Sequence, residues 1–294
     1  MTNKMIDQYL SQLRAELSSS DKAIIQDALA DAEEHLRTAL ESESQDPADE
    51  EAIQNIIESY GTPEEIADAY KAVEIYARPT LATSMVHQNG NVMARFFGVY
   101  ADPRAWGALL YMLISLLTGV IYFTWAVTGI SLAIPFALFI FGLPFVVLFD
   151  LSIKGIGLLE GRIVEALLGV RMPRRSVFWK KDLSWMQRLK LQLLDKYTWL
   201  GLLYMLLQLV FGVLYFTVFV TLIAISLAFM AIPIVQLVFE YPTIQIASGQ
   251  YFVPYTLLPV AVLLGFMLLT SSLHLARQLG KLHGRYAKFM LVGE

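Results

Sequence analysis

The stretch from Trp106 to Thr128 reads WGALLYMLISLLTGVIYFTWAVT, and 93 residues later the stretch from Trp199 to Thr221 reads WLGLLYMLLQLVFGVLYFTVFVT. Each stretch is about as long as a helix must be to cross a bilayer core roughly 30 Å thick. Leucine enrichment alone would not align the tryptophan, the Tyr-Met pair, the glycine and the Tyr-Phe-Thr run in one register. The sequence therefore predicts a membrane protein that contains a duplicated unit.

The match between the two copies extends beyond these stretches. Upstream, Asp102 matches Asp195 at the same offset of 93 residues. Downstream, the pattern Gly-x-Leu-x-Gly-Arg occurs at 157–162 and again at 280–285, an offset of 123 residues. The larger offset indicates an insertion between Thr221 and the last helix. Small residues such as Gly119 and Gly212 permit close helix contact, and we interpret them as packing positions rather than ligand sites.

Composition and charge divide the chain into two parts. The 294 residues are 56% hydrophobic and only 16% charged, which is unlike an ordinary soluble domain. Residues 1–78 hold 18 acidic and 6 basic side chains, whereas residues 79–294 hold 8 acidic and 16 basic ones. This asymmetry indicates an acidic soluble part followed by a basic membrane part.

The distribution of lysine and arginine predicts the orientation in the membrane. Residues 154–198 carry ten of them and the tail after residue 276 carries four, whereas 106–153 and 199–276 carry none. By the positive-inside rule both basic stretches are cytoplasmic. We therefore predict an all-α protein with four transmembrane helices in two repeated hairpins, both termini being on the inner side of a bacterial cytoplasmic membrane. The predicted helices span about 106–127, 131–153, 199–224 and 255–275, with a turn at Thr128-Gly129.

The predicted domains follow from this topology. Residues 1–78 form an acidic cytoplasmic domain, 79–100 a linker, 101–175 the first hairpin unit, 176–198 a basic interfacial segment, and 199–294 the second hairpin unit with an extracytoplasmic excursion at about 225–254. The segment SWMQRLKLQLLDKY, residues 184–197, places its apolar side chains on one face and is typical of a helix lying on anionic lipid. Two such hairpins are expected to be related by a pseudo-two-fold axis along the membrane normal.

The first 78 residues predict a small bundle of four helices. Apolar residues recur at three- and four-residue spacing in each segment. Asp46-Pro47 suits the start of the third helix, Gly61 suits its end, and Thr62-Pro63-Glu64-Glu65 is a capping box with proline at the first helical position. Neighbouring carboxylates occur beside a histidine, but without a second histidine at ligand spacing we interpret them as a solvated face: Glu33, Glu34, His35, Glu50 and Glu51.

Two family resemblances accompany this pattern. YLSQLRAEL, DAEEHL and EEAIQNIIESYGTPEEIADAY are similar to the HAAS domain over residues 4 to about 72. That family comprises helical cytoplasmic modules of bacterial membrane proteins, often encoded beside PadR-type transcription regulators. The resemblance implies a regulatory or protein-interaction role, with no catalytic residues to carry over.

The membrane half resembles a second family. DPRAWGALLYMLISLLTGVIYF, GLPFVVLFD, GLLEGRIVEALLGV and KLHGRYAKFML are similar to the sensor domain that precedes the kinase core in many actinobacterial histidine kinases, over about 100–291. No phosphoacceptor-histidine helix and no ATP-binding glycine motif accompany it here. If the domain senses a stimulus, its signal must pass through the HAAS-like domain or a partner.

The sequence offers no catalytic, cofactor-binding or metal-binding residues. Cysteine is absent, and neither a Walker A loop, a GxSxG elbow nor an HExxH motif occurs. His274 and His283 lie in or near the basic tail, where we interpret them as juxtamembrane anchors, and Asp150 is interpreted as a capping or snorkelling group. The amphipathic N-terminus does not read as a cleavable signal peptide. We therefore expect a protein that is not an enzyme and has no cofactor.

The leading hypothesis is a non-catalytic membrane sensor that couples a membrane or extracytoplasmic stimulus to a cytoplasmic partner through residues 1–78. The expected partners are the lipid bilayer and a transcription regulator or membrane complex, with no direct nucleic-acid contact and with homo-oligomers left open. The alternatives are a subunit of a membrane transport complex and an envelope scaffold. Few buried charges and only four predicted spans count against a transporter, and flux through proteoliposomes would distinguish it from a sensor.

Overall fold

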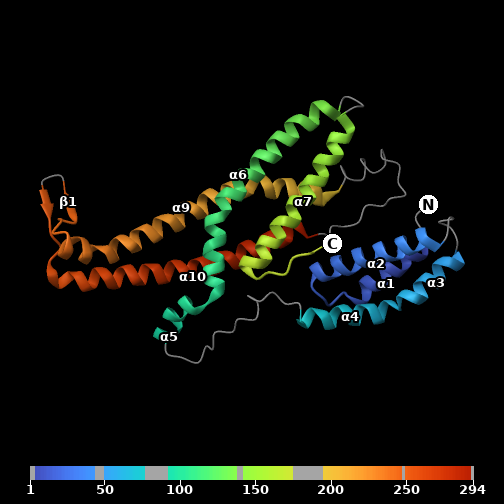
Figure 1. Ribbon diagram of the computed structural model, residues 1–294, viewed down its shortest axis with the longest axis horizontal. Helices are drawn as coiled ribbons and strands as arrows, with labels where there is room; N and C mark the ends of the chain where they lie inside the picture. The colour runs from blue at the N-terminus through green and yellow to red at the C-terminus, as the bar shows by residue number, and fades with distance from the viewer. Residues whose placement is uncertain are drawn as a thin grey trace. The chain divides into compact units, whose positions relative to one another are not determined.

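The computed structural model describes residues 4–43, 50–76, 92–137, 142–174, 195–246 and 249–292. Its described elements are almost entirely helical (Figure 1). By internal contacts the chain forms two units: residues 1–83, 124–206 and 284–294 make up unit 1, and residues 84–123 and 207–283 make up unit 2. The all-α prediction is confirmed.

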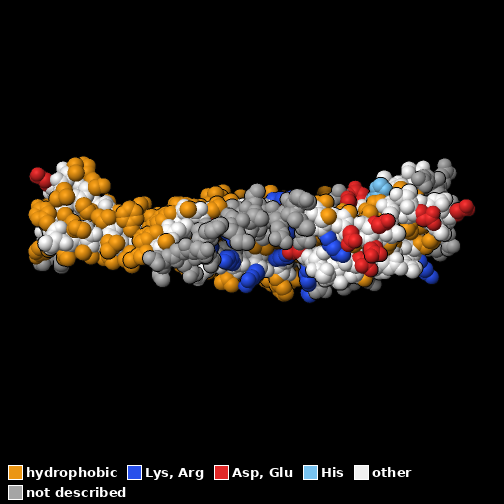
Figure 2. Space-filling model, turned by 90° about the horizontal axis from the view of Figure 1, so that it is seen from below, with side chains coloured by type: hydrophobic (Ala, Val, Ile, Leu, Met, Phe, Trp, Pro, Cys, Tyr) orange, Lys and Arg blue, Asp and Glu red, His pale blue; other side chains and the backbone are white. Residues whose placement is uncertain are grey.

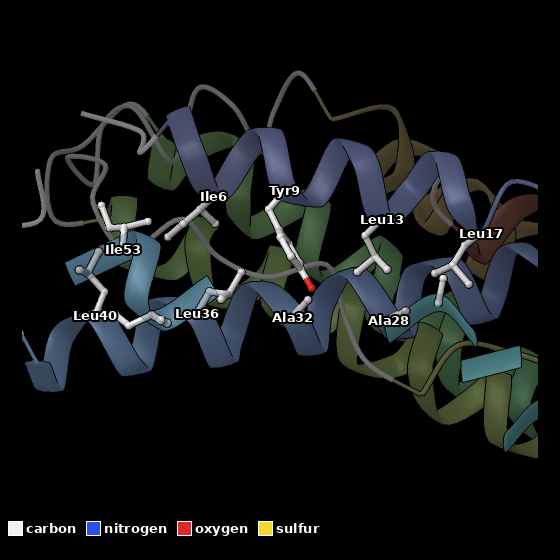
Figure 3. Close-up of a cluster of buried hydrophobic side chains, with 11 residues drawn as sticks. Ile6, Tyr9, Leu13, Leu17, Ala28, Ala32, Leu36, Leu40 and Ile53 are labelled. Carbon is white, nitrogen blue, oxygen red and sulfur yellow. The ribbon is translucent and has the colours of Figure 1, made fainter. Parts of the chain in front are cut away.

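Unit 1 contains the predicted N-terminal bundle, built from α1 (Lys4–Glu16), α2 (Lys22–Glu43), α3 (Glu50–Tyr60) and α4 (Pro63–Tyr76). We call these four helices the head. Leu13 and Leu17 are fully buried at its centre, and burying a leucine contributes roughly 1.5–3 kcal/mol. Figure 3 shows their side chains between α1 and α2. The same buried cluster contains Ile6, Tyr9, Ala28, Ala32, Leu36, Leu40, Ile53, Ile56 and Ala67.

Local signals position the turn between α3 and α4 as predicted. Gly61 ends α3 with a φ of 110°, a conformation that glycine adopts without strain. The Thr62 N–H donates to Glu65 Oε2 at 2.9 Å, and the Glu65 N–H donates to Thr62 Oγ1 at 3.3 Å. The capping box is therefore confirmed. Asp46-Pro47, the predicted start of α3, lies outside the described residues.

The first membrane helix, α6 (Pro103–Ala137), starts three residues before the predicted start at about 106. The Arg104 N–H donates to Asp102 Oδ1 at 3.0 Å, so Asp102 caps the helix and Pro103 occupies its first turn. Before it lie a short helix, α5 (Val92–Phe97), and a 3-10 turn, η2 (Gly98–Ala101), inside the region that we predicted to be a linker.

The end of α6 corrects the turn predicted at Thr128-Gly129. The helix continues to Ala137 through Pro135, and α7 begins only at Leu143. A Cβ placed on Gly129 would lie 1.8 Å from the Phe149 ring. The glycine therefore serves close packing between α6 and α7 rather than a reversal of the chain. The second helix, α7 (Leu143–Leu168), ends in the left-handed Gly169, whose φ is 68°.

The second repeat also has longer helices than predicted. Helix α9 (Lys196–Val238) extends 14 residues beyond the predicted end at 224, so most of the first half of the predicted excursion is helical. A two-stranded hairpin of β1 (Ile244–Ile246) and β2 (Gly249–Tyr251) follows, then η4 (Tyr255–Leu257) and α10 (Leu258–Leu291). Apolar side chains explain the extension, because nothing polar interrupts residues 222–235 except Ser226, which bonds to the Leu222 carbonyl of its own helix.

Three helical segments of the described part are long and apolar enough to cross a membrane: Pro103–Phe136, Lys196–Val238 and Tyr255–Leu291. Figure 2 shows hydrophobic side chains covering the surface of α9, α10 and the hairpin, whereas aspartate and glutamate gather over the head. Helix α7 carries five charged residues and does not meet the same criterion. The chain is a membrane protein, and the count of four spans stays a prediction.

Candidate functional site

A cluster of ion pairs in unit 1 joins the head to the chain that follows α7. Asp27, on α2 of the head, is buried, and its Oδ2 accepts from Arg171 Nη2 at 3.0 Å. Its Oδ1 accepts from the backbone N–H of Arg174. A second contact lies on α10, where the Lys288 ammonium pairs with Asp21 at the start of α2. The N-terminal end of α2 is thus held by three basic residues that lie outside the head.

Glu165 completes this cluster from α7. Its Oε1 accepts from Arg171 Nη1 at 3.1 Å and from Arg174 Nη2 at 3.3 Å, while Arg162 Nη1 lies 3.5 Å from its Oε2. Glu165 and Asp27 therefore share Arg171 between them. We call these five residues, Asp27, Arg162, Glu165, Arg171 and Arg174, the junction network. Partly buried, charge-assisted pairs of this kind hold two elements together more firmly than exposed pairs do.

In unit 2, polar side chains of the first repeat bind polar side chains of the second repeat. Asp102, from the first repeat, accepts from Arg277 of the second at 3.0 Å. Tyr111 of the first repeat lies 2.7 Å from Nε2 of His283 on α10, and this histidine is only 2% exposed. Asp102 and Tyr111 of the first repeat thus both pair with α10, the second helix of the other repeat.

The corresponding positions in unit 1 show the same exchange. Asp195, the counterpart of Asp102, lies 3.9 Å from Lys154, which is the counterpart of Arg277 at the offset of 123. Tyr204, the counterpart of Tyr111, donates to Glu160 at 2.8 Å, and Glu160 matches His283 at that offset. The two repeats therefore make equivalent contacts, except that the first repeat has the carboxylate of Glu160 where the second has the imidazole of His283.

Where α6 and α9 cross in unit 2, matching positions of the two repeats also contact each other, here through backbone atoms. A Cβ on Gly119 would lie 2.7 Å from the Gln208 carbonyl oxygen, and a Cβ on Gly212 would lie 2.3 Å from the Ser115 carbonyl oxygen. Since Gly119 matches Gly212 and Ser115 matches Gln208 at the offset of 93, the contact is symmetric. The close packing predicted for these two glycines is confirmed.

A buried polar cluster surrounds His283 in unit 2. Gln208 Nε2 donates to Tyr111 Oη at 3.2 Å, and Tyr215 Oη lies 3.3 Å from His283 Nδ1. The Gln208 side chain is fully buried, and its Oε1 accepts no hydrogen bond from the described residues. Our interpretation of His283 as a juxtamembrane anchor is wrong, because its ring is enclosed and hydrogen-bonded on both nitrogens. The sequence signal for this burial is the repeat itself, because His283 matches Glu160 at the offset of 123 residues and both side chains are buried.

The other residues singled out by sequence have structural contacts. His274 Nε2 lies 2.9 Å from the Phe96 carbonyl oxygen and its ring stacks on Phe96, whereas Asp150 accepts from Thr198 at 2.8 Å and pairs with Lys154 at 3.2 Å. In the head, the ring of His35 stacks on Tyr60.

No group of three potential ligands that could hold a metal ion occurs among the residues that the structure describes. Glu33, which we grouped with His35, instead accepts from Arg37 at 3.0 Å, one turn along the same helix. The side chain of Glu50 lies outside the described part.

Two head residues outside the membrane segments have shifted pKa values. Burial raises the pKa of the Tyr9 hydroxyl to about 12, with smaller contributions from the charges of Tyr60 and Glu65, and this hydroxyl donates to the Gly61 carbonyl at 2.9 Å. Hydrogen bonds from the Thr62 backbone and side chain lower the pKa of Glu65. Both groups stabilise the turn between α3 and α4.

Two known protein families match the chain, one in its membrane part and the other in the head. A family model described as "Putative sensor" matches residues 111–291, which is more than half of the chain. The chain belongs to this sensor family. A second model, described as HAAS, matches residues 8–69 in the head. No curated protein and no solved structure matches.

The order of the two family matches confirms the architecture that the sequence predicts, and the combination of a sensor domain with HAAS gives the protein a sensor role in signalling. Within the sensor family match lie Tyr111, Glu160 and His283, the residues of the exchanged contacts. Asp27 lies within the HAAS match, whereas its partners Arg171 and Arg174 lie within the sensor match. The junction network thus joins the two matched regions.

Proposed function

We propose that this chain is a non-catalytic, multi-pass membrane sensor whose head carries the signal to a cytoplasmic protein partner. In this proposal the sensor domain of the bacterial cytoplasmic membrane changes its packing in response to a stimulus, and the junction network transmits that change to α2. The head and both chain termini lie on the cytoplasmic side. The observation that carries the proposal is the bond of Asp27 to Arg171 and Arg174.

The chemistry of the junction network supports a reversible contact. Asp27 bonds to one arginine side chain and one backbone N–H, and each charge-assisted hydrogen bond contributes about 1.5–3 kcal/mol. Such a contact is strong enough to hold the head and weak enough to be released by a modest change in α7. The acidic surface of the head suits a partner with basic residues.

The double substitution Asp21→Asn with Asp27→Asn tests the proposal. It removes the negative charges that meet Lys288 and Arg171 while keeping the size of each side chain. The matched control is Asp68→Asn, because Asp68 is exposed and pairs only with Lys71 of its own helix in the described contacts. Hydrogen exchange of α2 in lipid nanodiscs reports the contact, and transcript profiling of the producing bacterium reports the signal.

We expect faster amide exchange at the start of α2 and altered transcripts in the double variant, with neither change in the control. Equal exchange and equal transcripts in the double variant and the wild type would refute the coupling. Faster exchange without any transcript change would show that the head is docked as described but does not carry a signal to gene expression.

A further inference from the structure

One exposed face of α7 combines apolar residues with an arginine. Leu148 is 63% exposed and Leu159 is 55% exposed, and Arg162 follows one turn later with half of its side chain accessible. Residues 11 and 14 positions apart fall on nearly the same face of a helix. In a membrane protein, such a face meets lipid, and an arginine at its end reaches the phosphates of the headgroups.

The same arrangement recurs on α10. Leu282 and Arg285 match Leu159 and Arg162 at the offset of 123 residues, and both are exposed on α10. Exposure of a leucine and an arginine three residues apart at the end of both second helices indicates a shared environment rather than chance. The basic charge lies on the side that the distribution of lysine and arginine assigns to the cytoplasm.

Arg162 is held only loosely within the protein. Its Nη1 lies 3.5 Å from Glu165 Oε2, and that buried oxygen accepts no hydrogen bond in the described part of the chain. The opposite oxygen, Oε1, accepts bonds from Arg171 and Arg174 at 3.1 and 3.3 Å. A phosphate that attracts Arg162 would therefore leave Glu165 with less positive charge nearby.

We propose that Arg162 binds the phosphate of anionic lipid headgroups in the cytoplasmic leaflet, and that this binding loosens the head. When Arg162 turns to the lipid, Glu165 draws Arg171 and Arg174 more strongly. Arg171 also donates to Asp27 through Nη2, and Arg174 donates to it through its backbone N–H, so the bond between α2 and the sensor domain weakens. The inference rests on the proposed function, and it names the density of anionic lipid as the stimulus.

The experiment uses the full chain in nanodiscs of phosphatidylcholine, with and without phosphatidylglycerol. Because the chain has no cysteine, spin labels can be attached at two exposed positions of unit 1 through Ser42→Cys on α2 and Ala166→Cys on α7. The distance distribution between the labels reports release of the head. We expect phosphatidylglycerol to lengthen and broaden it, and high salt to diminish the effect.

The variant Arg162→Gln separates lipid binding from the transmission of its effect. Arg162→Gln is expected to abolish the response to phosphatidylglycerol, whereas Arg285→Gln, a matched charge loss outside the junction network, is expected to preserve it. Each variant should retain phosphatidylglycerol about fivefold less well after a detergent wash, the contribution of one basic residue near an anionic surface.

Three outcomes would overturn the inference: no change of distance with phosphatidylglycerol, an undiminished change in Arg162→Gln, or an equal change on adding inorganic phosphate to phosphatidylcholine discs. The last would assign the site to a soluble anion. This measurement contains no partner protein, so its failure leaves the proposed signalling role standing. Conversely, a lipid-dependent distance would hold even if the head controls no transcript.

Discussion

The symmetric crossing of α6 and α9 makes a quantitative prediction for Gly212→Ala. The added Cβ would lie 2.3 Å from the Ser115 carbonyl oxygen and 2.9 Å from the Leu116 Cα. Both are backbone atoms of a helix, so relief requires α6 and α9 to move apart. Overpacking of this kind costs about 1–3 kcal/mol, which at least offsets the roughly 1 kcal/mol that alanine gains over glycine in a helix.

The matched control is Gly155→Ala on α7. A Cβ on Gly155 meets nothing within 4 Å, so this variant should gain only the helix-propensity term. Because the helix-propensity gain is the same in both variants, we expect Gly212→Ala to be less stable than Gly155→Ala by the overpacking cost alone, about 1–3 kcal/mol. Thermal unfolding in detergent, followed by intrinsic tryptophan fluorescence, gives the comparison. Equal unfolding temperatures for the two variants would refute the close crossing.

The remaining predictions concern single hydrogen bonds. Thr62→Ala should destabilise α4 by about 1 kcal/mol, measured as faster amide exchange in its first turn. Because the folded pKa of Glu65 is lowered, the stability that its carboxylate contributes is present above its ordinary pKa and is lost as the pH falls through the lowered value. Acid should therefore reduce the difference in amide exchange between the variant and the wild type. The raised pKa of Tyr9 acts in the opposite sense, because the stability that its hydroxyl contributes is complete below pH 10 and is lost as the pH rises to about 12. Circular dichroism of Tyr9→Phe should therefore show a smaller loss of helix at alkaline pH than the wild type shows. Tyr204→Phe removes a donor to the buried Glu160 and should destabilise the protein by about 1–3 kcal/mol in thermal unfolding, whereas the same change at an exposed tyrosine should have no effect.

The parts of the fold that depend on neighbouring residues could be predicted from the sequence. The turn at Gly61 and the cap at Asp102 each need only a few consecutive residues to form, and the structure shows both. The apolar repeat likewise identified the two homologous helices. The turn at Gly129 was misread because a glycine before more apolar residues looks the same whether it reverses a chain or admits a phenylalanine ring.

The contacts of the candidate site depend on residues far apart in the chain, which helical periodicity does not relate. Asp27 and Arg171 are separated by 144 positions, and each alone looks like an ordinary surface charge. His283 was read within its basic surroundings, although the repeat aligns it with Glu160, a second ionisable residue that the structure buries. Comparing the two copies position by position would have found this pair.

The exchange of contacts between the repeats determines how the chain can be divided for study. An expression product that stops after residue 174 would keep Tyr111 and lose His283, and the complementary product would keep Tyr204 and lose Glu160. Each product would therefore contain a tyrosine whose hydrogen-bond partner lies in the other product. The two fragments must be produced together in one cell if either is to pack as it does in the intact molecule.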